Sequence, residues 1–91
     1  MSFKVAILGA GPAGLASALR FKELEFSEFQ VFEQKNYPGG QAASFRDDQG
    51  FVWDLGGHVF FGQDLSIRAM IDRFQKDWCY HIRHSAIQIG Y

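Results

Sequence analysis

The sequence has little of what marks a secreted, membrane-spanning or nucleic-acid-binding protein. Its 91 residues include one cysteine, Cys79, which excludes an internal disulfide and suits a reducing compartment. No apolar run approaches the roughly 18 residues that a membrane-spanning helix needs. Nine Lys and Arg residues against ten Asp and Glu residues give a net charge of −1, without a basic excess to attract nucleic acid or anionic lipid. We therefore expect a cytoplasmic protein with neither nucleic acid nor a membrane as a partner.

What is present is the composition of a globular domain, with 47% hydrophobic and 16% aromatic residues. The N-terminus has some features of a signal peptide, namely Lys4, the apolar stretch 5–8 and the small residues 16–18. Four apolar residues are too few for the apolar core of such a peptide, so we set that interpretation aside. The length predicts one domain or part of one.

The first third of the chain predicts a β–α–β unit. Residues 3–8 are largely apolar and are expected to form a buried parallel strand. Pro12 suits the first turn of a helix, and residues 13–24 carry apolar side chains at helical spacing. A second strand is expected over residues 30–33, joined by a right-handed crossover.

The remaining segments predict smaller elements. Residues 36–44 are expected to be a loop with one helical turn, and residues 44–54 a β-hairpin. Asp64 is expected to cap a helix over residues 65–74. The alternating residues 79–91 predict a further strand, and most phenylalanines are expected in the core. Because two parallel strands do not complete a doubly wound sheet, we expect an α/β, Rossmann-like domain that is incomplete within residues 1–91, part of a larger protein.

Three glycines lie where the first strand meets the helix, in a complete G-x-G-x-x-G pattern. Gly9 permits the tight turn, Gly11 lets a pyrophosphate approach the backbone, and Gly14 lets the helix pack closely on the strand. The N–H groups and the dipole of the helix start favour a phosphate there. Glu33 lies 19 residues after Gly14, close to the spacing of about 20 for a carboxylate that binds ribose hydroxyls. The pattern predicts a dinucleotide site, against the alternative of a purely structural turn.

The segment FEQKNYPGGQAAS resembles the second signature of the flavoprotein superfamily of amine oxidases, protoporphyrinogen oxidases, phytoene desaturases and UDP-galactopyranose mutases. The resemblance implies FAD as the cofactor, with the acidic residue at the end of strand two and the glycine pair lying along it. Gln41 departs from the arginine, leucine or asparagine usual after that pair. Within the superfamily, GFVWDLGGHVFFG, at residues 50–62, most resembles the eukaryotic-type UDP-galactopyranose mutases, as do Trp78 and residues 81–83.

The resemblance implies that the full-length protein is an FAD-dependent enzyme, whereas the 91 residues alone are not expected to be active. The implied reaction is a reduced-flavin-dependent pyranose–furanose isomerisation of a small-molecule substrate, a nucleotide sugar, with NAD(P)H as a candidate reductant. His58 is the expected catalytic residue beside the isoalloxazine, and Asp54 is expected to brace its loop. The expected cofactor-binding residues are Gly9, Gly11, Pro12, Ala13, Gly14, Glu33, Gln34, Gly39, Gly40, Gln41, Ser44, Gly57 and His58.

Two other functions stay open at this point. One is an oxidoreductase of the amine oxidase or desaturase type, which passes a hydride from its substrate to the flavin. The other is a non-catalytic binding protein on the same fold, as in the GDP dissociation inhibitors. Cys79, His81 and His84 match no common zinc spacing, so no metal is expected.

Overall fold

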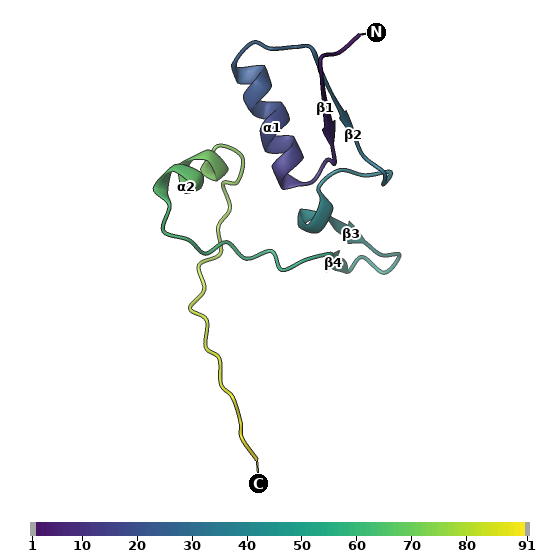
Figure 1. Ribbon diagram of the computed structural model, residues 1–91. Coiled ribbons are helices and arrows are strands. Elements are labelled where there is room, and N and C mark those ends of the chain that lie inside the picture. The colour runs from purple at the N-terminus through teal and green to yellow at the C-terminus, as the bar shows by residue number, and fades with distance from the viewer. Residues whose placement is uncertain (1, 91) are drawn as a thin grey trace. The chain divides into compact units, whose positions relative to one another are not determined.

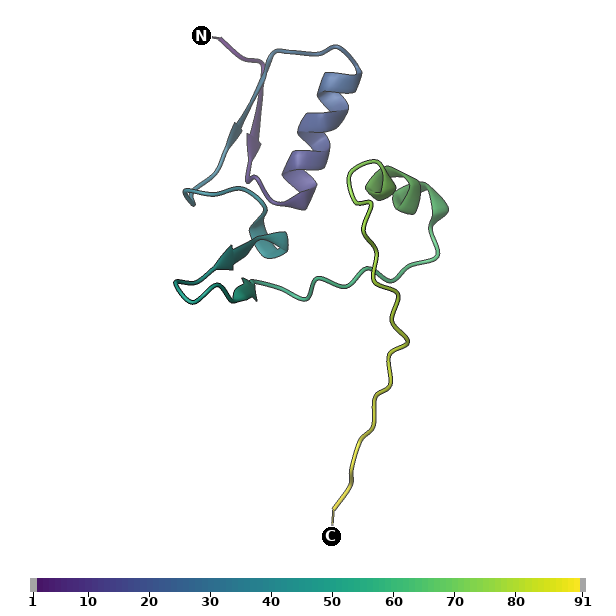
Figure 2. The same cartoon turned by 180° about the vertical axis from the view of Figure 1, so that it is seen from behind.

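The computed structural model describes residues 2–90, and it divides into two compact units, one up to Val59 and the other from Phe60 on. The first unit begins with the expected β–α–β arrangement of β1 (Val5–Leu8), α1 (Pro12–Glu23) and β2 (Phe29–Phe32). The two strands are parallel, with a register that runs from Val5 opposite Phe29 to Leu8 opposite Phe32. Their arrows point the same way, beside α1, in Figures 1 and 2. The mixed α/β fold with a parallel pair is therefore as predicted.

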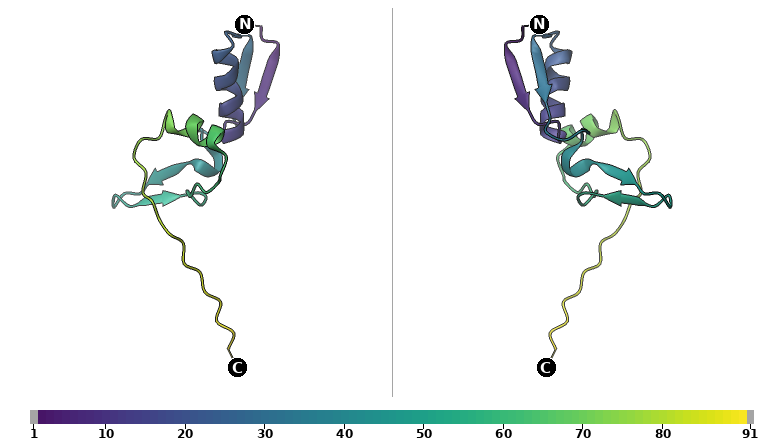
Figure 3. Two further views of the ribbon diagram at one scale, coloured as in Figure 1. Left: turned by 90° about the vertical axis from the view of Figure 1, so that its left-hand side faces the viewer. Right: turned by 90° about the vertical axis from the view of Figure 1, so that its right-hand side faces the viewer.

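Helix α1 covers one face of the β1–β2 sheet (Figure 3). The β-branched side chain of Ile7 lies close under Gly14, and the ring centroids of Phe21 and Phe29 are 5.4 Å apart. Small residues on α1 permit this close approach, because a side chain at Gly14 would meet the strand. Packing between the helix and this one face holds the β–α–β unit together.

The predicted burial of the first strand is wrong. Only Ala10 is buried among residues 2–90, while Leu8 is 84% and Phe3 41% exposed. The reason is that within the described residues a single helix covers a two-stranded sheet, so one face of each strand stays open. The expectation of a phenylalanine core is wrong as well, because Phe61, at 84%, and Phe74, at 65%, are largely exposed in the second unit.

The predicted hairpin is present as β3 (Ser44–Arg46) and β4 (Val52–Asp54), an antiparallel pair. Asp47 closes its turn, because its Oδ1 accepts the backbone N–H groups of Gln49 and Phe51, both at 2.9 Å. The single helical turn expected before the hairpin is the 3₁₀-helix η1 (Gly40–Ala42). The carboxyl ends of β1 and β2 are thus followed by a glycine-rich turn and a short hairpin, both within the first unit.

The second unit contains α2 (Leu65–Asp72), which begins as predicted. The Asp64 carboxylate accepts the backbone N–H groups of Ser66, at 2.9 Å, and Ile67, at 3.3 Å, and its bonds to Ser66 and Ile67 lower the pKa of Asp64. This is the hydrogen-bonding pattern of an N-cap. The helix ends two residues before the predicted position, with Arg73 at its C-cap.

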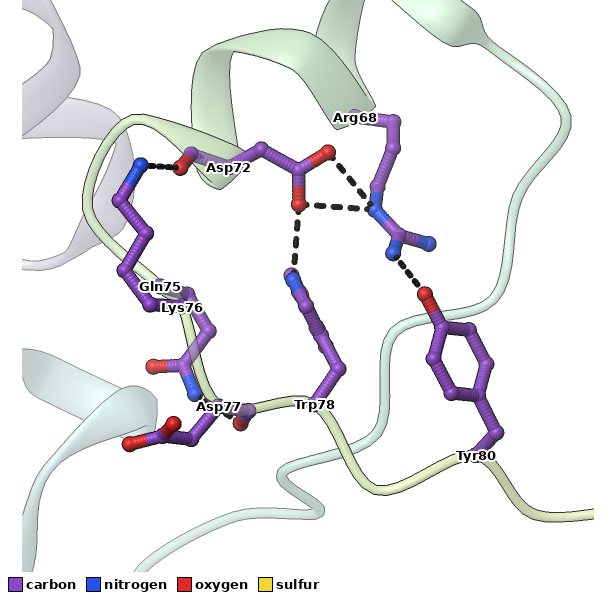
Figure 4. Close-up of polar contacts among 7 residues, drawn as sticks. All are labelled: Arg68, Asp72, Gln75, Lys76, Asp77, Trp78 and Tyr80. Carbon is purple, nitrogen blue, oxygen red and sulfur yellow. Dashed lines mark hydrogen bonds and ion pairs between the residues drawn. The ribbon is translucent and has the colours of Figure 1, made fainter.

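A polar cluster joins the end of α2 to the segment that follows (Figure 4). The Nε of Arg68 donates to both oxygens of Asp72, at 3.0 and 3.2 Å, and its guanidinium lies 4.4 Å from the Trp78 ring centroid. Trp78 Nε1 donates to Asp72 at 2.7 Å, and Arg68 also donates to the Tyr80 hydroxyl at 2.8 Å. These contacts fold the chain back onto the helix as far as Tyr80.

The strand predicted for residues 79–91 is wrong as far as residue 90. The described residues 79–90 form no ladder and run as an extended chain. An alternating pattern supplies side chains for two faces, but a strand forms only when a second strand satisfies its backbone N–H and C=O groups. None of the residues described here offers that partner. No helix between residues 2 and 90 has the length and apolar character needed to cross a membrane.

Candidate dinucleotide site

The glycine-rich turn lies between the end of β1 and the start of α1, where the pattern predicts it. Gly9 has a φ of +111°, a conformation that residues with a side chain rarely adopt. Gly11 is the extended N-cap of α1, and among residues 2–90 no side chain caps that helix start. Pro12 occupies the first turn and Ala13 follows it. The helix start is therefore left to an external acceptor, which suits a phosphate.

The space around each glycine separates their roles. A Cβ at Gly14 would lie 1.9 Å from the carbonyl oxygen of Gly9, so only glycine fits there. A Cβ at Gly11 would meet nothing closer than Gly40 Cα, at 3.9 Å. Packing within the described residues therefore requires glycine at position 14 but not at position 11. The backbone at Gly11 is therefore open to a ligand, and a pyrophosphate approaches the equivalent glycine of dinucleotide-binding turns in this way.

Ala10 connects three segments through its backbone. Its N–H donates to Glu33 Oε2 at 2.8 Å, and its carbonyl accepts the N–H of Gly39 at 2.7 Å. The neighbouring Gly9 N–H donates to the carbonyl of Phe32 at 2.7 Å. Ala10 is 6% exposed and was not among the predicted site residues. It acts only through main-chain atoms, so no side-chain signal at this position could have revealed it.

Glu33 follows β2 directly and is held in place by backbone donors. The Lys35 N–H, at 2.9 Å, and the Ala10 N–H bond to its two different carboxylate oxygens. These bonds, that of Lys35 first, lower the pKa of Glu33, because they favour the ionised form. An ionised carboxylate has about four acceptor positions. Because these bonds do not use all the acceptor positions, the carboxylate can accept a further hydrogen bond, for example from a ribose hydroxyl.

A hollow of about 580 Å³ lies at the carboxyl ends of the parallel strands, lined by Leu8, Gly9, Phe32, Glu33 and Gln34. Ligands of open α/β sheets bind at this edge. Two predicted site residues besides Gly9, namely Glu33 and Gln34, therefore line the same space. A smaller hollow near Lys22 and Phe29 lies at the opposite ends of the same elements, away from the glycine turn.

The glycine pair of the second signature packs against the first. Gly39 and Gly40 have φ values of +110° and +54°. A Cβ at Gly40 would lie 3.1 Å from Gly11 Cα, so the two backbones pass closely. Together with the Gly39–Ala10 hydrogen bond, this contact brings the two signatures side by side. The structure thus assembles residues that are far apart in the sequence.

His58 lies where η1 meets the β3–β4 hairpin, a contact region called the His58 junction below. Its Nε2 is 3.1 Å from the carbonyl oxygen of Gln41, and its Nδ1 is 3.3 Å from Asp54 and 3.4 Å from Ser44 Oγ. The structure therefore brings together Gln41, Ser44 and His58, which were predicted site residues. Gly57 has open space beside it, because among the described residues nothing beyond its immediate chain neighbours lies within 4 Å of the position that a Cβ would take. Trp78 and residues 81–83 belong to the second unit.

No group of three or more His, Cys, Asp and Glu residues within positions 2–90 is arranged to hold a metal ion, and Cys79 is exposed.

The parallel pair, the glycine turn at a helix start and the carboxylate after β2 together define a Rossmann-like dinucleotide-binding protein. A family model described as "NAD(P)-binding Rossmann-like domain" matches residues 7–74. The chain belongs to this family.

Three comparisons illustrate its relatives. The chain is 41% identical over 59 residues to zeta-carotene desaturase, chloroplastic/chromoplastic, of Capsicum annuum, covering 65% of this chain and 10% of that protein. It is 33% identical over 69 residues to mitochondrial protoporphyrinogen oxidase of Nicotiana tabacum, covering 76% and 13%. The crystal structure of a reduced UDP-galactopyranose mutase superposes with a TM-score of 0.60 at 48% identity, covering 67% of this chain and 13% of that one.

These relatives belong to the flavoprotein superfamily that the two signatures resemble, so the predicted superfamily is confirmed. They are also consistent with FAD as the cofactor. The chain spans about a tenth of the length of the curated relatives described above.

Proposed function

We propose that residues 1–91 form an incomplete part of an FAD-binding domain, and that the full-length protein is an FAD-dependent enzyme. The residues present fit the cofactor: an uncapped helix start and the open backbone of Gly11 suit the pyrophosphate, and Glu33 retains acceptor capacity for the ribose. The Gly39–Gly40 pair lies beside this turn and would follow the cofactor. When bound, FAD would supply the two-electron chemistry that the side chains of this segment cannot perform.

Within this class, we propose a UDP-galactopyranose mutase-like activity on a small nucleotide sugar, with reduction by NAD(P)H. The observation that carries it is the junction in which Gln41, Ser44 and Asp54 hold the His58 ring. A ring fixed in this way beside the glycine signatures is suited to stabilise negative charge on a reduced flavin. The 48% identity to the reduced mutase supports the same assignment.

The second candidate is a hydride-transferring oxidoreductase. It is favoured by the 41% identity to a zeta-carotene desaturase and the 33% identity to a protoporphyrinogen oxidase. Both candidates use the same cofactor-binding residues, so these residues do not separate them. A non-catalytic binding protein is disfavoured, because such a protein has no need of the open backbone at Gly11.

Turnover by the full-length protein separates the candidates. We expect UDP-galactopyranose to be converted only after reduction of the flavin, with no net consumption of reductant per turnover. Conversion that needs a stoichiometric electron acceptor would support the oxidoreductase instead. A purified protein without visible flavin absorption would overturn both. We keep a cytoplasmic location as part of the proposal; the relative from Capsicum annuum is described as chloroplastic/chromoplastic.

A further inference from the structure

The His58 ring is surrounded by oxygen atoms whose roles the geometry defines. The carbonyl of Gln41, 3.1 Å from Nε2, has no hydrogen and can only accept, so Nε2 carries one. The Ser44 hydroxyl donates its hydrogen to Asp54 Oδ1 at 2.7 Å. Near Nδ1 there remain the same carboxylate oxygen, at 3.3 Å, and the Ser44 oxygen, at 3.4 Å. This arrangement holds the ring through both of its nitrogens.

The junction is built by the fold rather than by chance contact of loops. Ser44 and Asp54 are register partners at the end of the β3–β4 ladder, and the next residue, Leu55, donates its N–H to the Ala43 carbonyl at 3.1 Å. A Cβ at Gly56 would lie 2.7 Å from the Gln41 carbonyl oxygen. Glycine at this position therefore lets the loop close onto η1 and return His58 to Asp54.

We propose that Asp54 is a positioning residue that acts through His58. It would hold the ring orientation through Nδ1 and place a negative charge against it, with Ser44 and the Gln41 carbonyl completing the set of polar groups in contact. The ring held in this orientation, in turn, would favour the reduced flavin. This inference rests on the proposed function, since it assumes that His58 lies beside the isoalloxazine.

A double-mutant cycle on the FAD-loaded, full-length protein tests it. Asp54→Asn keeps the shape of the side chain and removes its charge. We expect it to shift the flavin midpoint potential in the same direction as His58→Ala. In the His58→Ala background the same change is expected to have no effect, because the ring through which it acts is gone. Asp48→Asn, which removes an equal charge from the turn of the same hairpin, is the matched control and should leave the potential unchanged.

A second measurement does not depend on the flavin's position. In protein labelled on its histidine rings, Asp54→Asn should move the His58 ring signals at fixed pH and leave those of His81 and His84 in place. An unmoved His58 signal would overturn the positioning role, as would an equal Asp54→Asn shift of the potential with and without His58. If instead His58→Ala leaves the potential unchanged while Asp54→Asn still moves the ring signals, the proposed place of His58 at the flavin is what fails.

Discussion

The carboxylate of Glu33 accepts the backbone N–H of Ala10 at 2.8 Å, across 23 residues of sequence. The residue predicted to bind ribose hydroxyls therefore also fastens the glycine-rich turn to the end of β2. Through the Ala10 carbonyl the same turn holds Gly39 of the second signature. One acidic side chain thus links the parts of the site that would bind the ribose and the pyrophosphate.

Glu33→Ala is expected to weaken FAD binding by the full-length protein roughly ten- to a hundredfold, the range for loss of hydrogen bonds to a charged group. Titration of the flavin-free protein with FAD, followed by flavin fluorescence, measures the dissociation constant. Glu33→Gln keeps the size of the side chain and one acceptor oxygen, so its constant should lie between those of the native protein and Glu33→Ala. An unchanged FAD dissociation constant for Glu33→Ala would mean that Glu33 does not bind the cofactor.

Gly14→Ala is expected to lower the stability of the fold, whereas Gly11→Ala is expected to lower the affinity for FAD. At position 14 the added carbon would lie 1.9 Å from the Gly9 carbonyl oxygen. We therefore expect Gly14→Ala to lower the free energy of unfolding by about 1–3 kcal/mol or more. At position 11 there is space, and φ is −77°, so the fold should survive. There the loss should appear in FAD affinity, roughly tenfold or more, because the methyl group would meet the pyrophosphate.

Thermal unfolding and flavin content of the two purified variants check this contrast. Equal destabilisation by both substitutions would argue that the pattern serves packing alone. A Gly11→Ala protein with full flavin and normal affinity would remove the main support for a phosphate at this turn.

His58→Ala is expected to shift the flavin midpoint potential and to reduce turnover roughly tenfold or more, while FAD remains bound. Affinity and chemistry separate because the glycines and Glu33 would hold the phosphate and ribose portions, whereas His58 would contact only the reacting ring. Redox titration of both proteins at the same pH measures the shift. Overlapping curves with equal turnover would leave His58 without a role in the chemistry.

The cluster at the end of α2 should be sensitive to acid. The hydrogen bond from Arg68, and then that from Trp78, lower the pKa of Asp72 below its ordinary value of 3.8. A carboxyl group with a lowered folded-state pKa stabilises the fold above the unfolded value, and that stabilisation is lost as the pH falls through the folded one. We therefore expect these contacts to be intact above about pH 5 and to weaken below about pH 4.

The indole N–H resonance of Trp78, assigned with Trp78→Phe, follows this change, because that group donates to Asp72 at 2.7 Å. In Asp72→Asn the resonance should lose its dependence on pH in this acid range. The Trp53 indole, which donates to Asp47 at 2.8 Å in the other unit, serves as an internal comparison. A Trp78 signal with the same pH dependence in Asp72→Asn as in the native protein would contradict the prediction.

Local patterns were sufficient to predict much of the architecture. The apolar run, Pro12 and the helical spacing after it predict β1 and α1 to within two residues. Asp64 caps α2, and the turn residues close the β3–β4 hairpin, because each of these features depends on hydrogen bonds between near neighbours in the chain. The spacing from Gly14 to Glu33 likewise follows from the length of one crossover.

Other features depend on contacts that no local pattern contains. The alternation in residues 79–91 predicted a strand, but pairing needs a partner, and the described part of that segment has none. Leu8 has the character of a core residue, yet within the described residues a single helix covers its sheet. Ala10 lies at the centre of the glycine site because of its backbone hydrogen bonds. Asp54 contacts Ser44 and His58 because the strand register places it there. The sequence by itself determined the elements that near neighbours close, such as α1, α2 and the hairpin, and predicted the candidate site residues; the tertiary structure alone decided which of them meet, because hydrogen bonds across many residues depend on how the elements pack.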